Sequence, residues 1–95
     1  MPGYWVVTAS KIVDDDAFAE YRKHWGAIAE KYNAKMLAAL NGHENVEGDA
    51  ADRVTLVEFP TYEDALAAYN DPEYQKAVPF VQKAGARNLF IVKGM

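Results

Sequence analysis

The side chains best suited to chemistry in this chain are three tyrosines, one histidine and one glutamate. A histidine carries protons near neutral pH, a carboxylate inside an apolar segment can act as a general base, and tyrosine hydroxyls can orient a polar ligand. We therefore expect a small, partly aromatic molecule to be bound or transformed without a cofactor. The candidates for lining its pocket are Tyr21, His24, Glu58, Tyr69 and Tyr74.

Each candidate also has an ordinary structural explanation. Glu58 interrupts an apolar segment, so it faces a pocket, a dimer interface, or an ion pair with Arg53 or Arg87. His24 lies beside the apolar stripe of a helix, where it either shares a cleft with Tyr21 or is simply solvated. The other tyrosines are of the kind that buries the ring and keeps the hydroxyl at a polar edge. The competing hypothesis is a noncatalytic dimeric module for binding or assembly.

Several classes of partner are disfavoured by composition. The net charge is -4, the pI is about 5.0, and no basic cluster is present, so nucleic acid is not an expected partner. There is no cysteine, and the two histidines lack the spacing of a helical metal pair, so we expect no metal site. Nucleotide-binding glycine loops and the GxSxG elbow are absent from the sequence as well.

The length and composition predict one globular domain. A chain of 95 residues, 51% of them hydrophobic, is long enough for a single core, and we treat residues 1–95 as one domain. The segment MPGYWVV has neither a basic region before a long apolar run nor a cleavage site. We therefore expect a cytoplasmic protein with no membrane segment.

The first half of the chain predicts a strand and a long helix. Residues 3–12, GYWVVTASKI, are rich in β-branched and aromatic residues, and three aspartates follow as candidate helix caps. A helix to about Tyr32 places its large apolar side chains on one stripe, and Asn33 follows where a left-handed residue would end it. Tyr4 and Trp5 must point to opposite faces of the strand, so only one of them can reach a helix-side pocket.

The middle of the chain predicts a hairpin. AKMLAAL could extend the helix, but we interpret it as a strand. NGHENVEGDAAD then forms the connection, with Asn41-Gly42 as a turn pair. RVTLVEFP is a second strand, which Pro60 ends because proline cannot donate to a sheet.

The stretch EFPTYEDALAAYNDPEY predicts two further helix starts. Thr61 resembles an N-cap with Asp64 three residues later, and Asn70 ends that short helix. Asp71 then caps a second helix that has proline at its first position. We expect Pro79 to disturb this helix before ARNLFIV forms the last strand.

The resulting order, β-α-β-β-α-β, predicts an α+β, ferredoxin-like fold with a four-stranded, mainly antiparallel sheet. The strand segments WVV, TLV and LFIV are apolar without a break, so both faces of the sheet should be covered. The helices suffice for one face only. A second copy of the chain is the simplest cover for the other, which predicts a homodimer.

The chain also resembles a known family over essentially its whole length. GYWVV, AFAEYRK, EGDAADRVTLVEFPTYEDALAAYNDPEYQKA and a closing strand with Gly94 are similar to the domain of unknown function 1330 family. The resemblance implies ferredoxin-like protomers that pair into a dimeric α/β barrel, and it supports the strand at AKMLAAL. The family has no established activity to carry over.

The chain departs from that family at two places. Asn33-Ala34 stand where the family usually has a glycine pair, and Val-Pro-Phe-Val-Gln-Lys replaces a segment that commonly holds an arginine. The wider superfamily of dimeric α/β barrels includes cofactor-free oxygenases, lactone isomerases and haem-degrading enzymes. A shared fold does not transfer their functions.

Overall fold

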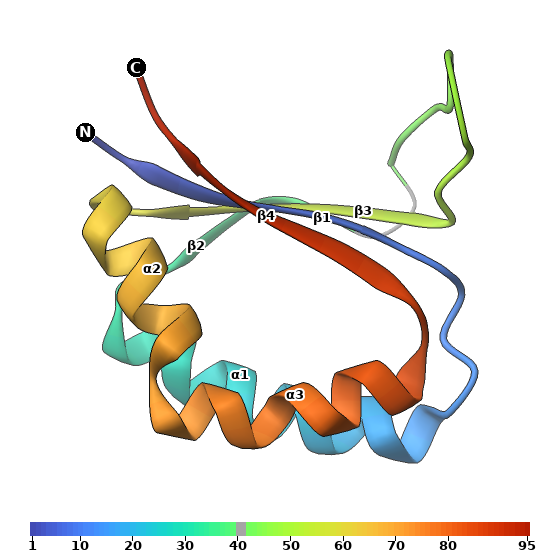
Figure 1. Cartoon of the computed structure of the whole chain (residues 1–95), viewed down its shortest axis with the longest axis horizontal. Coiled ribbons are helices and arrows are strands. Elements are labelled where there is room, and N and C mark those ends of the chain that lie inside the picture. Colours follow the sequence, from blue (N-terminus) through green and yellow to red (C-terminus); the bar gives the residue numbers. More distant parts are fainter. Residues whose placement is uncertain (40–41) are drawn as a thin grey trace.

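The computed structural model describes residues 1–39 and 42–95 and shows one antiparallel sheet with every helix on the same face (Figure 1). The strands run in the order β2-β3-β1-β4, and all three neighbouring pairs are antiparallel. This is the predicted ferredoxin-like α+β arrangement, and residues 35–38 form the expected strand. The elements are β1 (Gly3–Ala9), α1 (Asp15–Lys31), β2 (Lys35–Ala38), β3 (Arg53–Phe59), α2 (Tyr62–Asn70), α3 (Pro72–Ala84) and β4 (Arg87–Lys93).

Short-range caps set the ends of α1 as predicted. The Asp14 carboxylate accepts a 3.0 Å hydrogen bond from the Ala17 backbone N–H at the start of the helix. Beyond the last turn, Asn33 has a φ of 54°, the left-handed conformation that stops a helix. The predicted Asn41-Gly42 turn includes a residue outside the described part of the chain.

The second half of the chain contains two helices, as the caps predicted. Thr61 Oγ1 accepts a 3.0 Å hydrogen bond from Asp64 N–H, and Asp71 Oδ1 accepts one of 2.9 Å from Glu73 N–H. The expected disturbance at Pro79 is not seen, because α3 continues through it to Ala84. Since Pro79 is exposed, water can reach the carbonyl one turn earlier that loses its N–H partner.

The core lies between the sheet and the helices and centres on Trp5. Its indole N–H donates a 2.9 Å hydrogen bond to the Ala65 carbonyl, which ties β1 to α2. Gly3 allows this approach, since a Cβ there would lie 2.6 Å from Tyr62 Cα. The predicted α1 stripe joins the same core, and the rings around Trp5 are Trp25, Phe59, Tyr69 and Tyr74.

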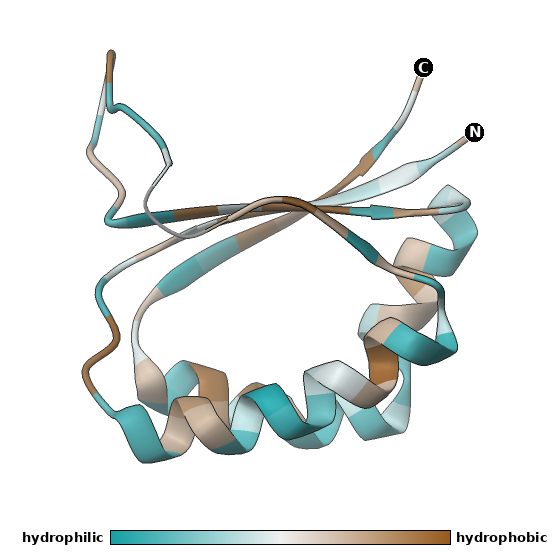
Figure 2. Cartoon of the chain, turned by 180° about the vertical axis from the view of Figure 1, so that it is seen from behind, coloured by the Kyte–Doolittle hydropathy of each residue, from teal (hydrophilic) through white to brown (hydrophobic). Residues whose placement is uncertain are grey.

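The two faces of the sheet differ in cover. Hydrophobic positions occur in the middle of the strands, and many positions of the helices are hydrophilic (Figure 2). On the face away from the helices, Phe90 is 56% exposed and Val92 is 44% exposed. Apolar side chains thus lie on both faces, although Tyr4 and Glu58 also lie on the open face, and the helices cover only the other face. Among the described residues, no helix is long and apolar enough to cross a membrane.

Candidate functional site

Two arginines mark one end of the sheet on its helix-facing side. Strand pairing places Arg53 of β3 and Arg87 of β4 on either side of Ala9, which is buried under the helices. Neighbouring strands lie about 4.8 Å apart, so the two Cα atoms are separated by about 10 Å. Alternation along each strand sends both side chains to the side where Val57 and Leu89 pack. The register therefore brings together two guanidinium groups from distant parts of the sequence.

The Arg87 guanidinium binds two tyrosine hydroxyls. Its Nη2 donates to Tyr74 Oη at 2.7 Å and its Nη1 donates to Tyr21 Oη at 3.4 Å. The two hydroxyls also lie 3.0 Å apart and share a hydrogen bond. One hydroxyl proton bridges the two oxygens, so the second proton remains available to another acceptor. We call these three side chains the tyrosine–arginine cluster.

Burial controls the protonation of this cluster. It raises the pKa of Tyr74 well above the ordinary value of 10.0, and the neighbouring Tyr21 adds to the rise. Burial also lowers the pKa of Arg53, and the positive charge of Arg87 acts in the same direction. Tyr74 is therefore a neutral hydroxyl at physiological pH, able to donate and accept hydrogen bonds but not to serve as a base.

The first cavity at this cluster lies between α1 and the sheet and has a volume of about 240 Å³. We call it the α1 cavity. Its polar groups come from three arginines and two hydroxyl side chains, namely Arg22, Arg53, Arg87, Tyr21 and Thr55. Val81 of α3 closes one side, and the remaining wall combines the rings of Trp5, Phe18 and Trp25 with aliphatic side chains.

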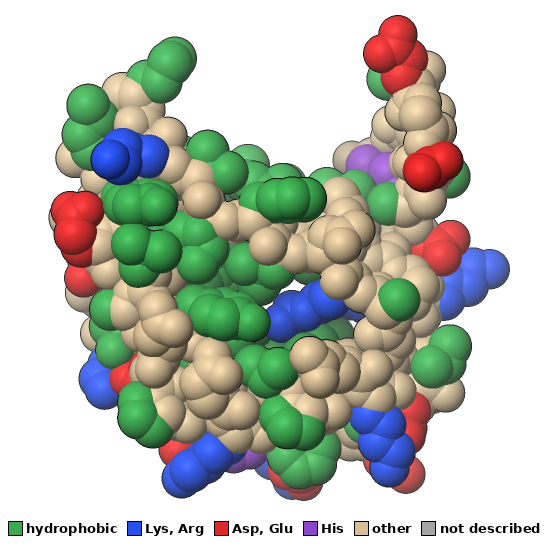
Figure 3. Space-filling model, in the orientation of Figure 1, with side chains coloured by type: hydrophobic (Ala, Val, Ile, Leu, Met, Phe, Trp, Pro, Cys, Tyr) green, Lys and Arg blue, Asp and Glu red, His purple; other side chains and the backbone are tan. Residues whose placement is uncertain are grey.

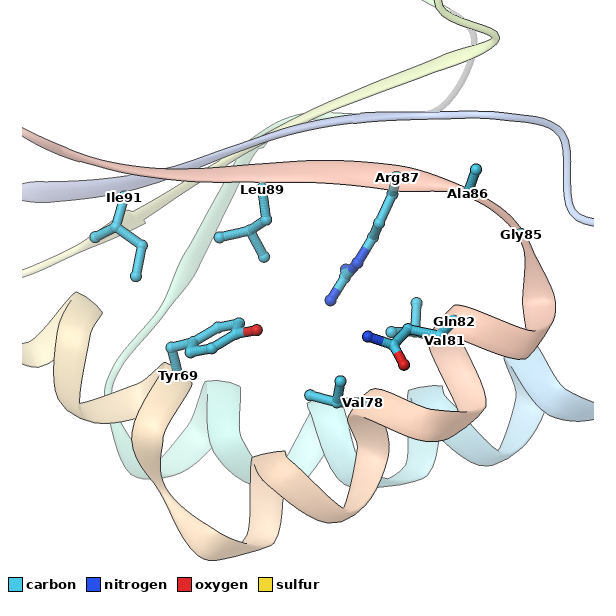
Figure 4. Close-up of a pocket in the computed structure, with 9 residues that line it drawn as sticks. All are labelled: Tyr69, Val78, Val81, Gln82, Gly85, Ala86, Arg87, Leu89 and Ile91. Carbon is cyan, nitrogen blue, oxygen red and sulfur yellow. The ribbon is translucent and has the colours of Figure 1, made fainter.

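A second cavity, of about 580 Å³, lies between α3 and β4. We call it the α3–β4 cavity. Arg87 points into it from β4, with Tyr69 and Gln82 on the helix side (Figure 4). Arg87 and Val81 line both cavities, so the tyrosine–arginine cluster stands between them. In the space-filling view, a Lys or Arg side chain lies in a hollow that hydrophobic groups border on one side (Figure 3).

The structure brings together three of the five predicted site residues. Tyr21 and Tyr74 belong to the cluster, and Tyr69 lines the α3–β4 cavity. His24 instead contacts Glu73 of α3, with Nδ1 2.9 Å from the carboxylate, and its ring stacks on Phe80. It is not among the residues that line either cavity.

Glu58 lies on the opposite face of the sheet from the cavities. Its carboxylate accepts a 3.4 Å hydrogen bond from Tyr4 Oη, across the β1–β3 pair. The expected ion pair with Arg53 or Arg87 is wrong, because alternation points these arginines to the other face. The same alternation shows which residue of the first strand can reach a pocket on the helix side: Trp5 faces the helices and Tyr4 does not.

Sequence reasoning missed Arg53 and Arg87 as site residues. The signal was alternation: Arg53 shares a strand face with Val57 and Phe59, and Arg87 shares one with Leu89 and Ile91. A charged residue in phase with core positions must enter the interior or its margin. In the described part of the chain, no group of three or more metal-binding side chains is placed to hold an ion.

Comparison with known proteins identifies a family but no activity. The family described as Domain of unknown function (DUF1330) matches residues 2–95. No curated protein matches the chain.

Several solved structures with the same fold come from proteins of unknown function. A protein of unknown function from Rhodopseudomonas palustris aligns with a TM-score of 0.73 at 18% identity, covering 99% of this chain and 82% of that one. A dimeric ferredoxin-like protein of unknown function from Jannaschia aligns with a TM-score of 0.71 at 11% identity, covering 99% and 100%. An EthD family protein from Bacillus halodurans aligns with a TM-score of 0.61 at 16% identity, covering both chains fully at 100%. These likenesses establish the fold.

Proposed function

We propose that this chain, which belongs to the DUF1330 family over residues 2–95, binds a small, partly aromatic molecule in the α1 cavity. The observation that carries the proposal is the tyrosine–arginine cluster, where hydrogen-bonding groups from α1, α3 and β4 converge beside a cavity. A concave, mostly apolar space with a few convergent polar groups is the usual form of a small-molecule site.

The chemistry of the wall supports a ligand with an aromatic part. Trp5 and Trp25 lie 5.3 Å apart by ring centroid, and Phe18 stacks on Tyr21 with centroids 5.9 Å apart. Flat rings of this kind favour planar ligands through offset and edge contacts. The hydroxyl proton not used between Tyr21 and Tyr74 is then available to an oxygen or nitrogen of the ligand.

The cluster supports binding more directly than a transformation. The raised pKa of Tyr74 keeps its proton in place at neutral pH, so the cluster orients a ligand by hydrogen bonds. Neither His24 nor Glu58 is among the side chains that line the cavities, and the proposal gives them no role in this site.

The two tryptophans supply a direct test, because they are the only ones in the chain and both line the α1 cavity. Phenol serves as a neutral aromatic probe, and the two indole N–H signals in a nitrogen-15 NMR spectrum report its binding. We expect both signals to shift with saturation. Tyr21→Phe should weaken phenol binding about fivefold or more through loss of one hydrogen bond.

Tyr4→Phe is the matched control, because it removes the same atom from the opposite face of the sheet. It should leave phenol affinity unchanged. Indole signals that stay in place at millimolar phenol would refute the proposed site, as would equal losses in the two variants.

A second proposal concerns the other face of the sheet: we infer that a second copy of the chain covers it, giving a homodimer. Strand register aligns Leu56, Val6 and Phe90 in one apolar row across the three longest strands. Phe90 and Val92 remain largely exposed there. A surface of this kind on a monomer marks an interaction site, and a two-fold pair lets one patch cover itself. The description of the Jannaschia neighbour as dimeric supports this choice of partner.

This arrangement also leaves room for the competing hypothesis of a noncatalytic dimeric module. In that case the open face carries the function, and the tyrosine–arginine cluster serves packing alone. The phenol titration separates the two hypotheses, because a purely structural cluster gives no saturable response at the indoles.

A further inference from the structure

We propose that the α1 cavity selects a carboxylate: its ligand is a small aromatic acid whose anionic group binds between Arg53 and Arg87. This inference rests on the proposed function, since it names the chemical class of the molecule bound in that cavity. The argument comes from charge, hydrogen-bond capacity and wall composition.

The α1 cavity is positively charged within an acidic protein. The chain carries a net charge of -4, yet three arginines and no aspartate or glutamate line this cavity. The third arginine, Arg22, is exposed on α1 at the edge of the cavity. Ion pairs among the described residues use lysines and His24, and none includes an arginine. A cavity of this kind attracts an anion and repels a cation.

The two inner arginines retain donors that protein groups do not use. A guanidinium has five N–H donors in a planar fork. Arg53 donates through Nε to the Ser10 carbonyl at 2.8 Å, and no described residue accepts a hydrogen bond from its two terminal nitrogens. Arg87 uses each terminal nitrogen once, on a tyrosine hydroxyl. A carboxylate can accept two parallel hydrogen bonds from such a fork.

Aromatic rings compensate the arginine charges only in part. The guanidinium carbons of Arg22 and Arg53 each lie 5.3 Å from the Phe18 ring centroid, and that of Arg87 lies 5.3 Å from the Tyr21 centroid. A ring face attracts a cation more weakly than a carboxylate does in a partly buried space. Burial, followed by the positive charge of Arg87, lowers the pKa of Arg53, and the opposing effects of Tyr21 and Asp52 do not offset them.

The same rings define the rest of the ligand. A carboxylate at the arginines directs the remainder of the molecule toward Trp5 and Trp25, deeper between α1 and the sheet. The volume of about 240 Å³ is small for a ligand pocket and suits a single ring with few substituents. Asp52, the acidic neighbour of Arg53 in sequence, is already held by the Lys11 backbone N–H at 3.1 Å.

Benzoate and benzamide test the inference, because they have the same shape and differ in charge. Titration of the full chain with each probe, followed by the indole N–H signals of Trp5 and Trp25, gives two affinities. We expect benzoate to bind at least about tenfold more tightly than benzamide. Added salt should weaken benzoate binding and leave benzamide binding unchanged.

Arg53→Met and Arg87→Met remove one charge each and keep an unbranched, apolar side-chain stem. We expect each variant to reduce the preference for benzoate over benzamide to about threefold or less. Lys76→Met is the control, because this exposed lysine pairs with Glu73 outside the cavity. If Arg87→Met fails to fold, Arg53→Met still decides, because the terminal nitrogens of Arg53 have no protein acceptor to lose.

The outcomes separate the two proposals. Equal affinity for both probes would overturn the inference while leaving the proposed binding function in place. A benzoate preference that survives in both arginine variants would also overturn it, because another group would then bind the anion. If neither probe shifts the indole signals, both the inference and the proposed function are wrong.

Discussion

The hydroxyl of Tyr74 accepts a 2.7 Å hydrogen bond from the Arg87 guanidinium, inside a core where Tyr74 has no exposed surface. This contact joins α3 to β4 across the space between the helices and the sheet. The acceptor for the Arg87 guanidinium is thus a neutral hydroxyl and not a carboxylate. It satisfies part of the arginine and leaves its positive charge uncompensated.

Tyr74→Phe tests how much this contact stabilises the fold. The ring stays in place, but one Arg87 nitrogen loses its acceptor in a buried setting, so we expect the free energy of unfolding to fall by about 1–3 kcal/mol. Urea denaturation measures the change. Tyr69→Phe removes a hydroxyl that points into the α3–β4 cavity and should change stability by less than about 0.5 kcal/mol. Equal effects of the two variants would contradict the importance of the contact.

Two glycine substitutions should act in opposite directions. A Cβ at Gly3 would lie 2.6 Å from Tyr62 Cα and 2.9 Å from the Thr61 carbonyl, so Gly3→Ala must push α2 away from β1. We expect it to destabilise the protein by about 1–3 kcal/mol. Gly26→Ala meets no atom within 4 Å in the middle of α1 and should stabilise the protein by about 0.5–1 kcal/mol. Thermal unfolding of both variants beside wild type measures the contrast.

Asp71 gives a prediction for acid stability. Hydrogen bonds from Lys31 and Tyr32, and one from the Glu73 backbone N–H, lower the pKa of Asp71 from 3.8 to about 2. Because the folded-state pKa lies below the unfolded one, this group stabilises the fold fully above pH 3.8. The contribution is lost as the pH falls through about 2. Wild-type stability should therefore decline over this window.

Asp71→Asn tests the acid prediction while keeping a side chain that can cap α3. Its stability should fall less steeply than that of wild type between the two pKa values, in urea titrations at successive pH values. Asp49→Asn, at a loop carboxylate without an ion pair to any described residue, should keep the wild-type profile. A parallel decline in wild type and Asp71→Asn would contradict the assignment.

Phe90→Asp tests the proposed dimer. Its side chain is 56% exposed on the open face, and a buried carboxylate without a partner in a two-fold interface is strongly unfavourable. We expect wild type to sediment as a dimer at micromolar concentration and Phe90→Asp as a monomer. Val13→Asp, at a residue 77% exposed beside α1, should remain dimeric. A wild-type monomer would disprove the homodimer.

The sequence was a good guide where a few neighbouring residues determine the structure. Asp14, Thr61 and Asp71 cap helices because the side-chain oxygen of each accepts a hydrogen bond from a backbone N–H two or three residues later in the sequence. Such a contact does not depend on distant parts of the chain. The strands followed from β-branched and aromatic runs, and turn-favouring glycine, asparagine and aspartate residues between the second and third strands predicted a hairpin. At Pro79 the helix continued, because packing along α3 outweighs one missing hydrogen bond.

The candidate site was harder to predict, because it depends on which way each strand faces. Moving one residue along a strand changes the face of the sheet, so Glu58 and its neighbour Val57 occupy different environments. Arg53 and Arg87 meet only through the register of both strands with Ala9. His24 similarly depends on how α1 turns against α3, which brings it to Glu73 and away from the sheet.

The spaces beside the tyrosine–arginine cluster also bear on the mechanical properties of the protein. The cavities of about 580 and 240 Å³ lie between two layers and are partly open to solvent. Hydrostatic pressure favours the state of smaller volume, so any part of this space that water does not fill lowers the resistance of the fold to pressure. A molecule that fills either space would make the protein stiffer, and resistance to pressure would then reveal occupancy without any knowledge of the chemistry.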